Sequence, residues 1–348
     1  MPMKHKLPIG KINPTILEKV VLKRLGAKRS EVVFGPKIGG DAAALKMNDC
    51  IIVVKVDPII GAKRRIGRLA VNVVLNDIAC LGAEPIALML TILLPEGSDV
   101  QYLEEIVEEA HREAIKANVA IVGGHTEVTL GLKDRPAIVI ASGMGRPVLD
   151  YIIPSDGAKA NDAILMTKTA GIEGTAIIAE DFKSLLKNRV PDDVIMKASS
   201  LYDETSVVKE ALTLTKARVV HAMHDPTDGG VLEGLYEMAE ASNLGFIVWE
   251  DRIPIAQETR IITEALNIDP LKLISSGTLL AAIPRNVVDL AISALKSIGI
   301  RATIIGYFKE NRKERVLVRK SGEEIEVNKP VIDELWRIHT QSCQQNNF

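Results

Sequence analysis

Two hydrophobic periods alternate along the first half of the chain. Leu103, Ile106, Val107, Ala110 and Ala114 recur at the spacing of one helix face, which predicts a helix within residues 102–118. Short apolar runs typical of strands occur at VVFG (32–35), CIIVVKV (50–56), AIVGG (120–124) and AIVIASGMG (137–145). This alternation predicts a mixed α/β fold.

The same mixture returns after a cluster of turn residues at 155–162. Strands are predicted in AILMTK (163–168), ARVVHAMHD (217–225) and LLAAIP (279–284), and helices over 173–188, over 192–216 and after residue 230. A length of 348 residues fits two domains of ordinary size. We therefore expect an N-terminal domain of residues 1–154 and a C-terminal α/β domain of residues 155–348.

The stretch IGRLAVNVVLNDIACLGAEP (66–85) predicts a buried helix with a carboxylate on its apolar face. That face consists of Ile66, Leu69, Ala70, Val73, Cys80 and Leu81. Asp77 falls in the middle of the apolar arc, where an unpaired charge would be strongly destabilising. Backbone N–H groups or an arginine could satisfy it, but the other acidic residues described below favour a bound cation. Arg68, Asn72 and Asn76 form a separate polar ridge at a spacing of four.

The segment HDPTDGGV (224–231) is predicted to be a turn between a strand and a helix. Thr227 or Asp228 can cap the helix, and Gly229 and Gly230 let the backbone approach a ligand closely. Free N–H groups at the start of a helix bind phosphate, so this loop, with Asp225, is a candidate phosphate site. An ordinary capped turn is the alternative.

Further acidic residues stand where strands are predicted to end. Asp41 follows the glycines of PKIGGD, Asp57 ends IIVVKVD, and Glu127 lies in AIVGGHTEV, where the strand is expected to end at Gly123 and Gly124. With Asp77 they form an oxygen-rich set suited to Mg²⁺ bound to a polyphosphate. Catalytic residues are not assigned, but Asp77 and Glu127 are candidates. His125, His221 and His224 are interpreted as structural histidines, because no further ligand stands at zinc-like spacing.

Composition narrows the possible classes of protein. The net charge of −2 argues against a nucleic-acid partner, and the apolar runs, such as residues 85–95, are too short to span a membrane. Three cysteines without a CxxC pattern indicate a reducing compartment, so we expect a cytoplasmic protein. The chain contains no GxxxxGK[ST] motif, so a nucleotide would need a different binding loop.

Taken together, these segments resemble the superfamily of aminoimidazole ribonucleotide (AIR) synthetase, thiamine-monophosphate kinase, selenophosphate synthetase and the hydrogenase maturation factor HypE. Residues 66–85 are similar to the HypE and thiamine-monophosphate kinase helix that ends in NDxAxxGAxP, and GGHTEV (123–128) is similar to their GGDT segment. MHDPTDGGVLEGLYEMAEAS (223–242) resembles the RDPTRGGL segment of HypE and the NEIAE that follows it.

The resemblance implies an N-terminal domain whose strands form a barrel across a homodimer, with ATP and Mg²⁺ in the cleft between the domains. It implies that residues of both halves bind the nucleotide or the metal. Those of the first half are Asp41, Asp57, Asn76, Asp77, Gly123, Gly124, His125, Thr126 and Glu127, and those of the second half are Asp225, Thr227, Asp228, Gly229 and Gly230.

The chain departs from HypE at three positions that concern its dehydration reaction. HypE ends in Pro-Arg-Ile-Cys, whereas this chain ends LWRIHTQSCQQNNF, with five residues after Cys343. Glu127 replaces the lysine that follows GGDT, and Ser276 replaces the acidic residue of SEGT.

These departures leave several hypotheses. The leading one is an ATP- and Mg²⁺-dependent, HypE-like enzyme that phosphorylates an oxygen of a carbonyl, carbamoyl or phosphate-bearing substrate, either a small molecule or bound to a protein. The alternatives are a non-catalytic nucleotide-binding assembly partner, an enzyme similar to thiamine-monophosphate kinase, and a maturation enzyme that uses Cys343 as the acceptor.

Overall fold

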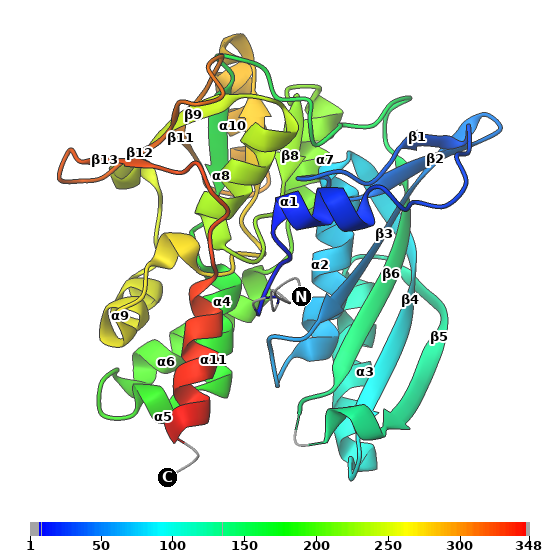
Figure 1. Ribbon diagram of the computed structural model, residues 1–348, viewed down its shortest axis with the longest axis vertical. Coiled ribbons are helices and arrows are strands. Elements are labelled where there is room, and N and C mark those ends of the chain that lie inside the picture. Colours follow the sequence, from blue (N-terminus) through cyan, green and yellow to red (C-terminus); the bar gives the residue numbers. More distant parts are fainter. Residues whose placement is uncertain (1–6, 8, 134, 346–348) are drawn as a thin grey trace, which may run out of the picture.

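Two β-sheets, each covered by helices, make up the computed structural model, which describes residues 7, 9–133 and 135–345 (Figure 1). The predicted mixed α/β class is confirmed. The connection between β6 and β7, residues 148–162, joins the sheets. The expected domain boundary between residues 154 and 155 falls in this connection and stays a prediction.

The first sheet has six strands in the order β1-β2-β3-β6-β4-β5. They are β1 (Val32–Phe34), β2 (Ala43–Met47), β3 (Cys50–Ile59), β4 (Ala83–Pro95), β5 (Ala120–Thr129) and β6 (Ile138–Pro147). Helices α2 (Ile66–Cys80) and α3 (Val100–Lys116) cover one face. Short helical turns, α1 (Pro14–Ile16) and Leu17–Val21, precede this sheet in the chain.

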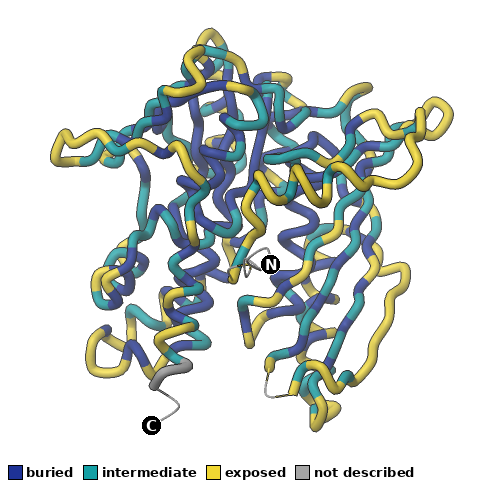
Figure 2. Tube along the Cα trace, viewed as in Figure 1, coloured by how far each residue is buried: buried dark blue, intermediate teal, exposed yellow. Residues whose placement is uncertain are grey.

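The face of this sheet that points away from α2 and α3 carries no helix in Figure 1, and strand β5 at its edge is coloured as exposed in Figure 2. Val56, Ile86, Met89 and Val122 present large apolar side chains to solvent there, and β5 forms an exposed edge. Contiguous exposed apolar surface is typical of a face that binds another molecule. The predicted barrel across a homodimer would cover this face, and it stays a prediction.

The second sheet has seven strands in the order β13-β12-β9-β11-β7-β10-β8. They are β7 (Ala163–Thr167), β8 (Ala222–His224), β9 (Gly245–Trp249), β10 (Leu280–Ile283), β11 (Ala302–Lys309), β12 (Arg315–Val318) and β13 (Glu324–Glu326). Side chains on alternate positions of β7 enter two different cores, Ile164 and Met166 with α8, and Leu165 with α7 and α10.

Helices surround the second sheet and extend below it in Figure 1. They are α4 (Ile172–Asp181), α5 (Lys183–Leu186), α6 (Asp192–Ser200), α7 (Val208–Ala217), α8 (Gly230–Ala241), α9 (Gln257–Leu266), α10 (Val288–Ser297) and α11 (Glu334–Gln345). The predicted helix over 192–216 is wrong in its middle, because a 3₁₀ turn (Leu201–Glu204) and a loop separate α6 from α7. The helix predicted over 173–188 is likewise divided at Phe182.

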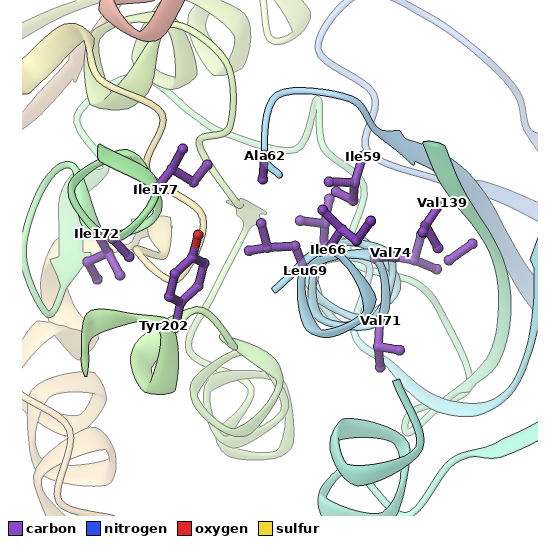
Figure 3. Close-up of a cluster of buried hydrophobic side chains, with 14 of the residues drawn as sticks. Ile59, Ala62, Ile66, Leu69, Val71, Val74, Val139, Ile172, Ile177 and Tyr202 are labelled. Carbon is purple, nitrogen blue, oxygen red and sulfur yellow. The ribbon is translucent and has the colours of Figure 1, made fainter. Parts of the chain in front are cut away.

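Helix α2 forms the centre of the molecule. Every residue of it except Arg68 is buried, and its apolar side chains pack on both halves of the chain. In Figure 3, Ile66, Leu69 and Val74 lie between Val139 of the first sheet and Tyr202 of the second half. The prediction of a buried helix beginning at Ile66 is therefore confirmed.

The polar ridge of α2 binds the second half of the chain. Arg68 Nη1 lies 2.6 Å from Asp203 Oδ1, and Asn72 Nδ2 donates to Thr205 Oγ1 over 2.9 Å. Asn76 makes three hydrogen bonds, to the Thr205 carbonyl, to Asp225 and from the Val207 N–H. The three polar residues that recur at a spacing of four in the sequence therefore form a contact between the two domains.

Gly67 allows α2 and α3 to approach closely. A Cβ atom there would lie 2.1 Å from the carbonyl oxygen of Ile106. Glycine to alanine within a helix normally stabilises the fold, but here the methyl group must push the helices apart. We expect Gly67→Ala to lower the free energy of unfolding by about 2 kcal/mol, measured by chemical denaturation.

Gly131→Ala is the matched control, because no heavy atom lies within 4 Å of its added Cβ. This control should change stability by less than about 0.5 kcal/mol. A stabilised Gly67→Ala variant would contradict the close contact between the helices.

Candidate functional site

A cleft of about 760 Å³ lies between the two halves of the chain. Both halves contribute polar side chains to its walls: Asp41, Lys55, Asp57, Asp77, His224, Asp225, Thr227, Asp228, Glu233 and Glu237. Residues 9–14 near the N-terminus and residues 329–333 with Trp336 complete the lining. The structure therefore brings Asp41, Asp57 and Asp77 together, opposite the loop after β8.

Lys55 lies between two of these carboxylates. Its Nζ is 2.6 Å from Asp77 Oδ2 and 3.0 Å from Asp57 Oδ2. The prediction that Asp57 ends its strand is wrong, because β3 continues to Ile59. Lys55 and Asp57 are two residues apart on a strand and so face the same side. That alternation in VVKVD is the sequence signal by which Lys55 could have been recognised.

Burial and charge shape the ionisation of Asp77. Burial raises its pKa to about 7, and the Asp41 and Asp57 carboxylates add to this effect while Lys55 opposes it. Asp77 does have a cationic partner, but in this structure the partner is the Lys55 ammonium. Burial opposes the charge on Lys55, yet Asp77 and Asp57 outweigh it and raise the pKa of the ammonium.

A chain of charged side chains crosses the cleft from Asp41. His224 Nδ1 lies 2.5 Å from Asp41 Oδ1, and His224 Nε2 lies 3.0 Å from Glu237 Oε2. Lys11 Nζ approaches Glu237 to 3.1 Å. Burial disfavours the imidazolium, but Asp41 and Glu237 outweigh burial and raise the pKa of His224 well above its usual value. Burial would raise the pKa of Glu237, but Lys11 and His224 lower it to about 2.

The loop after β8 holds Asp225 in a buried position. Asn76 Nδ2 donates to Asp225 Oδ2 over 2.8 Å, and the Gly277 N–H donates to Oδ1 over 3.2 Å. Burial raises the pKa of Asp225 well above its usual value, and the Asp77 charge adds to the rise. Thr227 lies in the cleft lining beside it.

The start of α8 differs from the predicted capped turn. Its N-cap residue is Gly229, with φ of 87°, and neither Thr227 nor Asp228 makes a side-chain cap. Asp228 instead accepts from Trp336 Nε1 over 3.2 Å. A Cβ on Gly230 would lie 2.6 Å from the Leu273 carbonyl, so glycine is required by packing.

The Gly229 N–H, which the sequence left free for a phosphate, donates to Asp333 Oδ2 over 2.6 Å. Burial raises the pKa of Asp333 to about 8, and it raises that of nearby Glu233 to about 7. Asp333 and Glu233 were not predicted from the sequence. The sequence pattern gives little indication of their role, because it depends on how the C-terminal segment packs across α8.

The GGHTE segment lies elsewhere in the chain. The prediction that the strand ends at its glycines is wrong, because β5 continues through Thr129. Gly123, Gly124, His125, Thr126 and Glu127 are all exposed and outside the cleft lining. His125 Nε2 lies 3.0 Å from Glu127 Oε2.

No group of three or more His, Cys, Asp or Glu side chains is arranged to hold a metal ion within the part of the chain that the structure describes. Glu127 is thus separated from the three aspartates with which it was grouped. His221 pairs with Asp162 over 2.8 Å and His224 with Asp41, which is consistent with structural histidines. Among the described residues, no helix combines the length and apolar character needed to cross a membrane.

This fold and cleft define a two-domain α/β protein whose candidate site lies between the domains. The AIR synthase related protein N-terminal domain matches residues 39–146, and the C-terminal domain of the same family matches residues 159–319. The chain therefore belongs to the AIR synthase related protein family, as its motifs predicted.

Two curated relatives are connected with hydrogenase maturation. A putative hydrogenase expression/formation protein of Methanocaldococcus jannaschii is 31% identical over 341 residues, which cover 94% of this chain and 97% of the relative. Carbamoyl dehydratase HypE of Cupriavidus necator is 30% identical over 256 residues, with 73% and 70% covered. The crystal structure of HypE in complex with ATP superposes with a TM-score of 0.71 at 25% identity, covering 95% of this chain and 98% of that one.

The charge chain through Glu237 predicts a dependence of stability on pH. A carboxylate with a lowered pKa stabilises the fold above its unfolded-state pKa, near 4.5, and this contribution is lost as the pH falls through about 2. We expect Glu237→Gln to destabilise the fold by at most about 3 kcal/mol at pH 7. The difference from wild type should shrink as the pH falls from 4.5 toward 3, measured by denaturation at each pH.

Glu104→Gln, on the exposed face of α3, is the control and should keep the wild-type pH profile. A Glu237→Gln difference that stays constant with pH would refute the ion pairs described.

Proposed function

We propose that this protein is an ATP- and Mg²⁺-dependent enzyme of hydrogenase maturation that phosphorylates an oxygen of a carbonyl or carbamoyl group. The observation that carries the proposal is the convergence of Asp41, Asp57 and Asp77 on one interdomain cleft, which Asp225, Thr227 and Asp228 line from the second half of the chain. The relative that is a carbamoyl dehydratase and the HypE structure with ATP support this class of reaction and substrate.

The donor set suits Mg²⁺, which prefers carboxylate and phosphate oxygens. Asp57 and Asp77 already share one cation, the Lys55 ammonium, so their oxygens are placed to bind positive charge. Both would hold Mg²⁺, with Asp41 beside them. When bound, Mg²⁺ would neutralise charge on the triphosphate of ATP.

Phosphoryl transfer would depend on how the side chains of the cleft hold the triphosphate. The ammonium groups of Lys55 and Lys11 would orient the triphosphate, whereas the N–H groups of Gly229 and Gly230 already donate to Asp333 and to the Thr227 carbonyl. The substrate oxygen attacks the γ-phosphorus, the bond to the β,γ-bridging oxygen breaks, and ADP leaves. The proton lost by the substrate would pass to solvent water, because Asp77, as a proposed metal ligand, is not free to accept it.

Glu127 enters the proposal through a second copy of the chain. Gly123, Gly124, His125, Thr126 and Glu127 lie on the exposed edge strand β5, so a homodimer formed by the first sheet would have to bring them to a partner's cleft. In that arrangement they would bind the nucleotide, and Glu127 would be a further candidate for catalysis.

Cys343 is a weaker candidate as an acceptor. It belongs to α11, in a part of that helix whose side chains lie outside the described residues. We propose that the substrate is a separate molecule, small or protein-bound. The alternatives are a non-catalytic, nucleotide-binding partner and an activity similar to that of thiamine-monophosphate kinase.

The proposal predicts nucleotide binding that requires the metal. The cleft is rich in carboxylates, so a bare triphosphate is repelled. In isothermal titration we expect ATP to bind with Mg²⁺ but not with EDTA, and Asp57→Asn or Asp77→Asn to weaken binding at least about tenfold. Asp49→Asn, in the exposed turn between β2 and β3, is the control and should bind normally.

The proposed site would be refuted if the wild type did not bind ATP with Mg²⁺, or if Asp57→Asn and Asp77→Asn both bound it as tightly as the wild type. Release of ADP that depends on a carbamoyl compound supports an enzyme, whereas nucleotide binding without ADP release under any substrate tried supports the non-catalytic partner.

A further inference from the structure

Lys55 is built into the floor of the cleft. Its side chain is 19% exposed, its backbone pairs with Gly143 of β6, and its Nζ contacts carboxylates from both β3 and α2. Val56, the next residue, points to the outer face of the sheet, so the strand itself directs Lys55 into the cleft.

Lys55 occupies the oxygens that a metal ion would need. It contacts Oδ2 of Asp57 and Oδ2 of Asp77, and a divalent ion bridging these two groups would meet the ammonium at the same atoms. Two positive ions cannot share these oxygens without repulsion. The carboxylates and Lys55 together are therefore a closed, compensated group in the absence of ligand.

Other lysines of the cleft have different partners. Lys37 Nζ lies 2.5 Å from Asp156 Oδ2, and Lys11 Nζ lies 3.1 Å from Glu237. Among the ion pairs of the described residues, Asp57 and Asp77 both pair with Lys55, and neither pairs with Lys11 or Lys37.

We propose that Lys55 is an internal counter-ion that keeps free divalent metal out of the cleft and is released from Asp57 and Asp77 when the metal enters with a triphosphate. A lysine side chain has four flexible methylenes, so its ammonium can turn from the carboxylates to a phosphate oxygen. The site thus selects the metal–nucleotide complex over the metal ion by itself. The identity of the nucleotide rests on the proposed function, whereas the exclusion of metal rests on the ion pairs.

The test uses Mn²⁺ without nucleotide, with the free ion measured by electron paramagnetic resonance in a titration of the full chain. We expect wild type to bind Mn²⁺ weakly and Lys55→Met to bind it at least about tenfold more tightly, because two carboxylates lose their cation. Lys55→Arg keeps the charge and should remain weak.

Lys37→Met is the matched control, since it removes one positive charge from the same cleft without freeing Asp57 or Asp77. Its Mn²⁺ affinity should change less than about twofold. Equal affinity of wild type and Lys55→Met, or an equal rise in both lysine-to-methionine variants, would overturn the proposal.

Circular dichroism and thermal unfolding establish that each variant is folded. If Lys55→Met unfolds, Lys55→Gln, whose amide can still donate to one carboxylate, takes its place in the same titration. A failure of ATP to bind would remove the proposed function but would leave this Mn²⁺ comparison readable, so the two failures are distinguishable.

Discussion

Repulsion between carboxylates is the constraint around which this molecule is arranged. Asp41, Asp57 and Asp77 enter one cleft from the first half of the chain, and Asp225 and Glu237 face them from the second. Two like charges 4 Å apart repel by about 4 kcal/mol at an effective dielectric constant of 20, a large part of the 5–15 kcal/mol that stabilises a domain. Such a cleft can exist only if each charge is compensated or neutralised by a proton.

Both solutions are present on both walls, because burial also raises the pKa of Asp77 on the first wall, and Lys11 and His224 also compensate Glu237 on the second. On the first wall Lys55 compensates Asp57 and Asp77, while His224 reaches Asp41 from the opposite domain. On the second wall burial raises the pKa of Asp225 and Asp333. Asn76 joins the walls, because one amide binds Asp225, the Thr205 carbonyl and the Val207 N–H. The contact that fixes the two domains is therefore also a contact of the site.

The sequence predicted those features that depend on local pattern. The apolar period of residues 66–80 located α2, and its polar ridge at a spacing of four proved to be the interdomain contact. The strand and helix flanking residues 224–231 were also predicted correctly. Each of these features is encoded by residues close together in the chain.

Features that depend on tertiary contact were not predictable in the same way. Glycines at 123 and 124 suggested the end of a strand, but parallel pairing with β4 continues the strand past them. The cap of α8 failed as a prediction because Asp333, more than a hundred residues away, takes the Gly229 N–H. Asp77 was recognised as a charge in need of a cation, yet nothing within its own helix identifies Lys55 as the partner.

The ionisation of the carboxylates on the two walls also determines which ligand suits the cleft. A free metal ion favours ionised carboxylates and must displace the Lys55 ammonium from Asp57 and Asp77. A bare triphosphate favours protonated carboxylates. Burial raises the pKa of Glu233 to about 7 and that of Asp333 to about 8, so these groups can hold protons near neutral pH, and burial raises the pKa of Asp225 as well. The metal ion by itself therefore favours loss of protons from the cleft, whereas the triphosphate by itself favours their uptake. A metal–triphosphate complex carries less net charge than the bare triphosphate, so it would require a smaller change in the protonation of the cleft carboxylates.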